Sequence, residues 1–167
     1  DCLSREGILR AARALPRVLT DPGDKQARHD LTLASLFGGL SLANGGLGAV
    51  HGFAGVIGGW TGAAHGAICG RLLPGVLKVN ADALADLDQP NRMAEVAQLL
   101  GANDLPSAIQ DLEDLLETGG VPRLKDMGLA EADLPAIAEA SKSSSSMKGN
   151  PVALSPDQAL AALTYAF

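Results

Sequence analysis

The chain has 167 residues, of which 47% are hydrophobic but only 3% are aromatic, and its net charge is −6 at pH 7. This length predicts one ordinary domain with a real core, and a core of Leu, Ala, Val and Ile favours packed helices over a β-sandwich. The basic residues are scattered rather than clustered, so the composition argues against nucleic acid as a partner.

The N-terminal part of the chain predicts two helices. Apolar residues in 3–19 recur at a spacing that forms one stripe along a helix, and the DPGD segment at 21–24 ends it. Residues 25–44 are apolar almost all the way round, so we expect a helix that is buried on most sides. The first residues have the pattern of a helix already under way rather than of a signal peptide, which suggests that an upstream part was removed.

The forty residues 31–70 contain no Asp, Glu, Lys or Arg, and twelve of them are glycine. A membrane hairpin is one interpretation of such a stretch. Its apolar runs are broken before the roughly 20 residues that a membrane span needs. We therefore favour a central pair of helices in a domain outside the membrane, where glycine lets backbones approach one another closely.

The remainder of the chain predicts amphipathic helices joined by short polar turns, without a strand or an internal repeat. The expected helices continue from the uncharged stretch to about residue 79, then cover 90–101, 104–120, a segment from about 131, and a last one from 155. Ser155 is the expected N-cap of the last helix. Residues 141–151 are expected to form a flexible polar loop, and the acidic side chains of the later helices to face solvent. The fold class is all-α, with 1–167 as a single domain.

Two histidines within the uncharged stretch are the candidate site. His51 and His65 are fourteen residues apart, and on one continuous helix they would lie about 21 Å from each other, too far to share an ion. If the chain turns back at Gly58, Gly59 and Gly62, both imidazoles can reach one metal at about 2.0 to 2.2 Å. On spacing alone, a buried histidine that only donates to a backbone carbonyl remains the alternative.

The third histidine, the two cysteines and a glycine-rich segment are not expected to form a functional site. His29, between an arginine and an aspartate, is expected to be a solvated helix residue. Cys2 and Cys69 lie far apart without a metal-binding or disulfide spacing, so they are interpreted as free or buried thiols in a reducing cytoplasm. The segment GGLGAVHG is superficially like a dinucleotide-binding loop, but no strand precedes it and His51 occupies the third glycine position.

Residues 49–80, AVHGFAGVIGGWTGAAHGAICGRLLPGVLKVN, resemble the signature of the iron-containing (group III, metal-dependent) alcohol dehydrogenases. The positions that match the signature are His51, His65, Gly66, Leu72, Leu73, Pro74 and Asn80. The preceding segment 27–52 is similar to a buried helix of that family, and 147–167 to its Asn-Pro turn and last helix. The resemblance therefore covers nearly the whole chain.

The resemblance implies that this chain is the C-terminal helical domain of such an enzyme, with a dehydroquinate-synthase-like helical fold. In the family a Rossmann-like N-terminal domain binds NAD or NADP, and one Asp and three His hold a divalent metal. That metal, Fe²⁺ or Zn²⁺, polarises the alcohol oxygen during hydride transfer. By the match, His51 and His65 are two of the four ligands, and no residue of this chain is assigned a catalytic role.

The chain departs from the family pattern in three ways. The other two metal ligands and the nucleotide-binding domain have no counterpart in it, and Gly55 stands where many members have a further histidine. We therefore expect weak metal binding and no turnover from this chain alone, with NAD(P) bound only when the N-terminal domain is present. A second hypothesis is that the chain is a stand-alone helical interaction domain derived from the enzyme, in which His51 and His65 are merely packed and no catalysis takes place.

The resemblance also implies the partners of the intact enzyme. Its substrate is a small alcohol or carbonyl compound, and no membrane is involved. Without the N-terminal domain, the uncharged face around Gly45–Gly62 is expected to be exposed, and exposed apolar surface of this kind favours a homo-oligomer.

Overall fold

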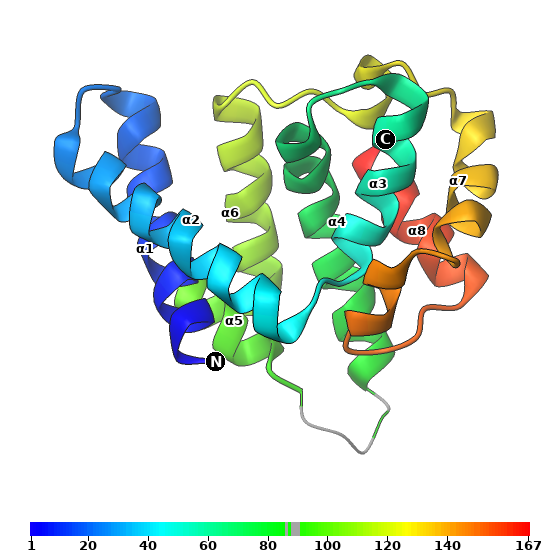
Figure 1. The fold of residues 1–167 in the computed structure, drawn as a ribbon, viewed down its shortest axis with the longest axis horizontal. Helices are drawn as coiled ribbons and strands as arrows, with labels where there is room; N and C mark the ends of the chain where they lie inside the picture. Colours follow the sequence, from blue (N-terminus) through cyan, green and yellow to red (C-terminus); the bar gives the residue numbers. More distant parts are fainter. Residues whose placement is uncertain (86, 88–90) are drawn as a thin grey trace. The chain divides into compact units, whose positions relative to one another are not determined.

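The computed structural model of the chain describes residues 1–85, 87 and 91–167, and within them every regular element is a helix (Figure 1). The elements are α1 (Cys2–Thr20), α2 (Lys25–Gly45), α3 (Ala49–Thr61), α4 (His65–Ala85), α5 (Met93–Leu100), α6 (Leu105–Thr118), the 3-10 turns η1 (Leu124–Met127) and η2 (Glu131–Asp133), α7 (Leu134–Ser141), η3 (Ser145–Gly149) and α8 (Pro156–Ala166). The all-α fold class is confirmed.

The chain divides into two compact units. The first unit comprises Asp1–Gly46 and Arg92–Asp111, and the second comprises Leu47–Asn91 and Leu112–Phe167. That residues 1–167 form a single domain stays a prediction.

The first unit is held together by small buried residues and by ion pairs at its surface. α1 packs along α2 and also contacts α5. The backbone of α1 comes close to α2 at Gly7, where a Cβ would lie 3.5 Å from Cβ of Phe37. Arg10 pairs with Asp30 between the two helices at 2.5 Å. A surface ion pair of this kind adds little to stability by itself.

The helix α2 corrects one expectation from the sequence. Its extent agrees with the prediction, but it was expected to be buried on most sides, and Ala27 is its one buried residue. Leu36, Leu40 and Leu42 are 55%, 43% and 45% exposed. The physical reason is that α2 packs against α1 along one face, while these leucines on its other faces stay open to solvent.

The second unit contains the main hydrophobic core. Its helices α3, α4, α7 and α8 pack against one another. The largest apolar side chains buried there are Phe53, Ile57, Ile68, Leu72, Ile137 and Leu163. At Gly75 the backbone of α4 lies so close to α8 that a Cβ would be 2.8 Å from the carbonyl oxygen of Ala162. α4 continues to Ala85, beyond the predicted end near residue 79.

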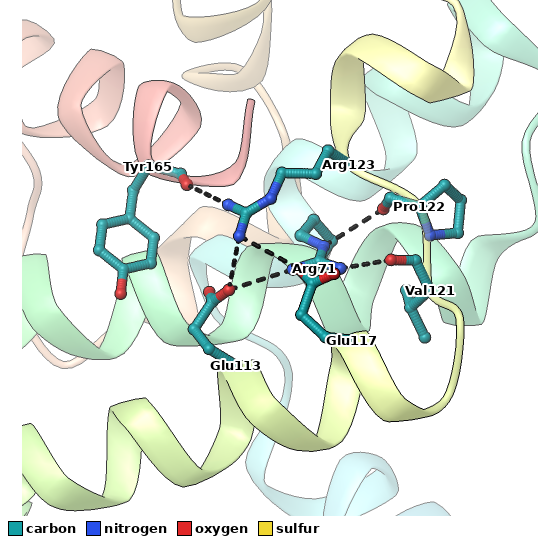
Figure 2. Close-up of polar contacts among 7 residues, drawn as sticks. All are labelled: Arg71, Glu113, Glu117, Val121, Pro122, Arg123 and Tyr165. Atoms are coloured by element: carbon teal, nitrogen blue, oxygen red, sulfur yellow. Dashed lines mark hydrogen bonds and ion pairs between the residues drawn. The ribbon is translucent and has the colours of Figure 1, made fainter.

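Arg71, the first charged residue after the uncharged stretch, is fully buried in the second unit. Its guanidinium donates to Glu113 at 3.1 Å and to Glu117 at 3.2 Å, both on α6. Arg123 donates to the same two carboxylates at 3.1 and 3.2 Å, so two arginines and two glutamates form one cluster (Figure 2). The cluster joins α4 to α6.

Backbone carbonyls complete the surroundings of the Arg71 guanidinium. Its Nε donates to the carbonyl oxygen of Pro122 at 3.2 Å, and its Nη2 donates to that of Val121 (Figure 2). The sequence predicted that the acidic residues of this helix face solvent, which is wrong for Glu113, because its side chain is turned toward Arg71 and is only 7% exposed. A buried arginine requires such a partner.

The helix ends agree largely with local sequence signals. Ser155 caps α8 by accepting from the backbone N–H of Gln158 at 3.2 Å, and the Gln158 side chain accepts from the N–H of Ser155 at 2.8 Å, so the predicted cap is confirmed. α5 ends at Gly101 with φ +91°. Its predicted start at Pro90 lies outside the described residues. Residues 141–151, expected to be a flexible loop, include η3, which contacts α3.

Of the helices that the structure describes, none is by itself both long and apolar enough to span a membrane. Among the described helices, only Lys25–Gly45 and Ala49–Thr61 taken together, across the break between them, have the length and composition of a membrane span.

Candidate metal centre

The chain changes direction between α3 and α4 in a three-residue turn. α3 ends at Thr61, and Gly62 adopts a left-handed conformation with φ +67° while its N–H donates to the carbonyl oxygen of Gly58 at 2.9 Å. The sequence placed this reversal at Gly58, Gly59 and Gly62; the turn begins at Gly62, whereas Gly58 and Gly59 lie within α3. A helix tolerates glycine, whereas the left-handed position at its end favours it strongly.

The turn brings the two predicted histidines together. His51 lies in the first turn of α3 and His65 is the first residue of α4, and their ring centroids are 5.4 Å apart with the ring planes at 53°. Partial burial lowers the pKa of His51, and the nearby His65 lowers it further. The neutral imidazole that this favours is the form that offers a lone pair to a metal.

A third potential ligand lies beside the two histidines. The Sγ atom of Cys69 is 3.4 Å from Nε2 of His65. One ligand atom from each of His51, His65 and Cys69 can be chosen so that all three lie within 4.8 Å of one another. Sequence reasoning assigned Cys69 no role in the site. The signal was the spacing of four residues after His65, which places both side chains on one face of a helix.

Asn150 holds the start of α3 in place. Its Oδ1 accepts from the backbone N–H of Ala49 at 3.1 Å, which caps the helix turn that carries His51. Its amide also exchanges hydrogen bonds with Asn80 of α4, at 2.7 and 3.2 Å. Both asparagines thus tie the helix of His51 to the helix of His65. The sequence showed them only as matches to the family pattern.

A close backbone approach makes this cap possible. A Cβ at Gly149 would overlap the carbonyl oxygen of Leu47, and a Cβ at Gly48 would lie 3.2 Å from Oδ1 of Asn150. Larger residues at these two positions would push Asn150 away from the first turn of α3.

The remaining candidate positions lie apart from this chemistry. His29 is exposed on α2, as expected for a solvated residue. Gly55 is exposed on α3, and a Cβ there would meet nothing within 4 Å, so the position has room for a larger side chain. Both cysteines are free thiols.

Comparison with known proteins identifies the family. The model of the Fe-containing alcohol dehydrogenase family, C-terminal part, matches residues 1–167. The chain is 30% identical over 160 residues to 1,3-propanediol dehydrogenase of Klebsiella pneumoniae, which covers 90% of this chain and 40% of that protein. It is also 30% identical over 170 residues to alcohol dehydrogenase 4 of Saccharomyces cerevisiae, which covers 100% of this chain and 44% of that protein.

Solved structures agree with this assignment. The crystal structure of a 1,3-propanediol oxidoreductase is 30% identical and superposes on all of this chain and 45% of its own with a TM-score of 0.89. An alcohol dehydrogenase from Oenococcus oeni is 27% identical with a TM-score of 0.87 over the same shares of the two chains. The chain spans less than half the length of these relatives. It belongs to the iron-containing alcohol dehydrogenase family, and it corresponds to the helical C-terminal domain of that family.

Proposed function

We propose that this chain is the metal-binding half of an NAD(P)-dependent alcohol dehydrogenase or carbonyl reductase, in which His51 and His65 ligate Fe²⁺ or Zn²⁺. The observation that carries the proposal is the 5.4 Å separation of the two imidazole rings across the α3–α4 turn. Two histidines merely packed in a core have no reason to meet at the partly exposed starts of two helices.

The donor atoms fit the metal that the family name implies. Imidazole nitrogen suits both iron and zinc. When bound, such an ion acts as a Lewis acid on the alcohol or carbonyl oxygen. The role of this chain is to hold the two imidazoles at a fixed separation, which the Asn80–Asn150 pair supports by fastening the two helices that carry them.

The substrate class of the proposal follows from the relatives. Those named above are two alcohol dehydrogenases and two enzymes of 1,3-propanediol, so the proposed substrate is a small alcohol or the matching carbonyl compound. Hydride transfer to NAD(P) needs a nucleotide-binding domain, which these 167 residues do not supply. We therefore propose that this chain alone catalyses no turnover. We also propose that the intact enzyme is cytoplasmic.

Self-association is a further part of the proposal. Trp60 on α3 is 52% exposed, although α3 carries no charged residue. Large apolar side chains that stay exposed on a neutral helix favour contact with another protein surface, here a second copy of the chain.

Metal titration of the 167-residue chain tests the assignment of ligands. We expect one Zn²⁺, or one Fe²⁺ under anaerobic conditions, per chain in equilibrium dialysis, and loss of that binding in both His51→Ala and His65→Ala. His29→Ala is the matched control and should bind as the parent chain does. Unchanged binding in His51→Ala and His65→Ala would contradict the proposal and favour histidines with a packing role.

A further inference from the structure

We infer that Cys69 is a third protein ligand of the metal centre, so that this chain by itself presents a His₂Cys donor set. The inference rests on the proposed function, because it concerns the same ion. It replaces the expectation of a weak site with only two protein ligands.

The geometry of the three donors carries the inference. Metal–nitrogen distances of about 2.0 to 2.1 Å and a metal–sulfur distance of about 2.3 Å imply that neighbouring donors of a tetrahedral site lie about 3.3 to 3.6 Å apart. Sγ of Cys69 and Nε2 of His65 are already 3.4 Å apart. The whole set lies within 4.8 Å, so binding of an ion requires the three donors to move only a little closer together.

The positions of the three residues in the fold support the same conclusion. His65 and Cys69 occupy one face of the first turns of α4, so their relative placement is set by the helix itself. His65 is exposed while His51 and Cys69 are partly buried, which gives an ion a path to the donors from solvent. Cys2, the other cysteine, is exposed in the first unit and lies near no such pair of imidazoles.

Ligation of a metal ion by Cys69 needs no oxidant, reductant or other reagent. The thiol loses its proton to the buffer, a sulfur–metal bond forms, and nothing is oxidised or reduced. A thiolate is a soft ligand and favours zinc, iron or cobalt over magnesium.

Cobalt substitution distinguishes this arrangement from a hydrogen bond between thiol and imidazole. Co²⁺ is added to the 167-residue chain, kept reduced without competing thiols, and its absorption spectrum is recorded. We expect the visible bands of cobalt together with a near-ultraviolet sulfur-to-cobalt charge-transfer band. Cys69→Ser should lose the charge-transfer band and weaken cobalt binding, and the matched control Cys2→Ser should keep both. Far-ultraviolet circular dichroism checks that each variant remains helical.

The outcomes separate the two proposals. Cobalt bound in a manner that requires His51 and His65, but without a charge-transfer band, overturns the role of Cys69 and leaves the proposed function standing. A band that persists in Cys69→Ser also overturns it. Absence of any cobalt binding by the folded chain overturns the proposed function and this inference together.

Discussion

The two compact units of this chain use different means to stay folded. The second unit buries large apolar side chains such as Phe53, Ile68 and Leu163 and a fully buried arginine. In the first unit the buried residues of α1, α2 and α5 are small, namely Gly7, Ala14, Ala27 and Ala97, while large leucines such as Leu36 remain exposed. Ion pairs at the surface of this unit link α1 to α2, to the turn before it and to α5.

This difference explains where the candidate metal centre lies. A ligand set must be held to within a fraction of an ångström, which favours a unit whose side chains are locked by packing. His51, His65 and Cys69 all belong to the second unit. The first unit instead leaves large apolar side chains such as Leu36 exposed.

The largest difference in stability between the two units is expected when the buried charge cluster is disrupted. Arg71→Met should lower the free energy of unfolding by about 3 to 5 kcal/mol, because it leaves Glu113 in a buried position with fewer donors. Arg10→Met in the first unit removes a partly exposed partner of Asp30 and should cost much less. Urea denaturation followed by circular dichroism measures both. Equal losses would show that the two units do not differ in this way.

Two glycines in helices are expected to give effects of opposite sign. Gly75→Ala places a methyl group 2.8 Å from the carbonyl oxygen of Ala162 in the second unit and should cost about 1 to 3 kcal/mol. Gly39→Ala lies within α2 of the first unit, where a Cβ meets nothing within 4 Å, and should stabilise the chain by about 0.5 to 1 kcal/mol. The thermal unfolding midpoints of the two variants show whether each substitution stabilises or destabilises the chain. A change in the same direction for both variants would contradict the proposed difference in packing between the two units.

The smallest effect concerns the helix cap of the first unit. The backbone N–H of Ala27 lowers the pKa of Asp24 below its ordinary value of 3.8, and the Arg17 guanidinium lowers it further. A carboxyl whose pKa is lowered on folding stabilises the chain above its unfolded pKa, and this stability is lost as the pH falls through the folded pKa.

Asp24→Asn isolates that contribution, because asparagine also caps helices but carries no charge. The variant should be slightly less stable than the parent chain near neutral pH. The difference should shrink and vanish as the pH falls below 3.8 and through the lowered folded pKa. Unfolding midpoints of both chains over this range measure it. A difference that stays constant across the range would show that the charge of Asp24 contributes nothing.

Several features of the fold were predictable from the sequence because they depend on neighbours along the chain. Apolar spacing located the helices, and the Ser155–Gln158 capping box marked the start of α8. Gly101 marked the end of α5, since glycine readily adopts the left-handed conformation there. Glycines between the two histidines also indicated the turn between α3 and α4, which begins at Gly62, although Gly58 and Gly59 lie within α3.

Other features were not predictable because they depend on contacts between distant segments. The acidic spacing of α6 is the same whether Glu113 faces solvent or Arg71, and 42 residues separate this pair. Cys69 was interpreted as an isolated thiol, because its distance to His51 depends on how α3 meets α4. Asn150 lies 101 residues from the Ala49 N–H that it caps.

The sequence by itself therefore determined where most helices lie, several of their ends, the family and the candidate pair of histidines, since periodicity, capping and the family motif are carried by residues close together in the chain. Only the tertiary structure decided which faces are covered, which carboxylate is buried and which thiol lies beside the imidazoles. The physical reason is that burial and ligand distances are set by the relative placement of helices, and many placements are compatible with the same local pattern of side chains.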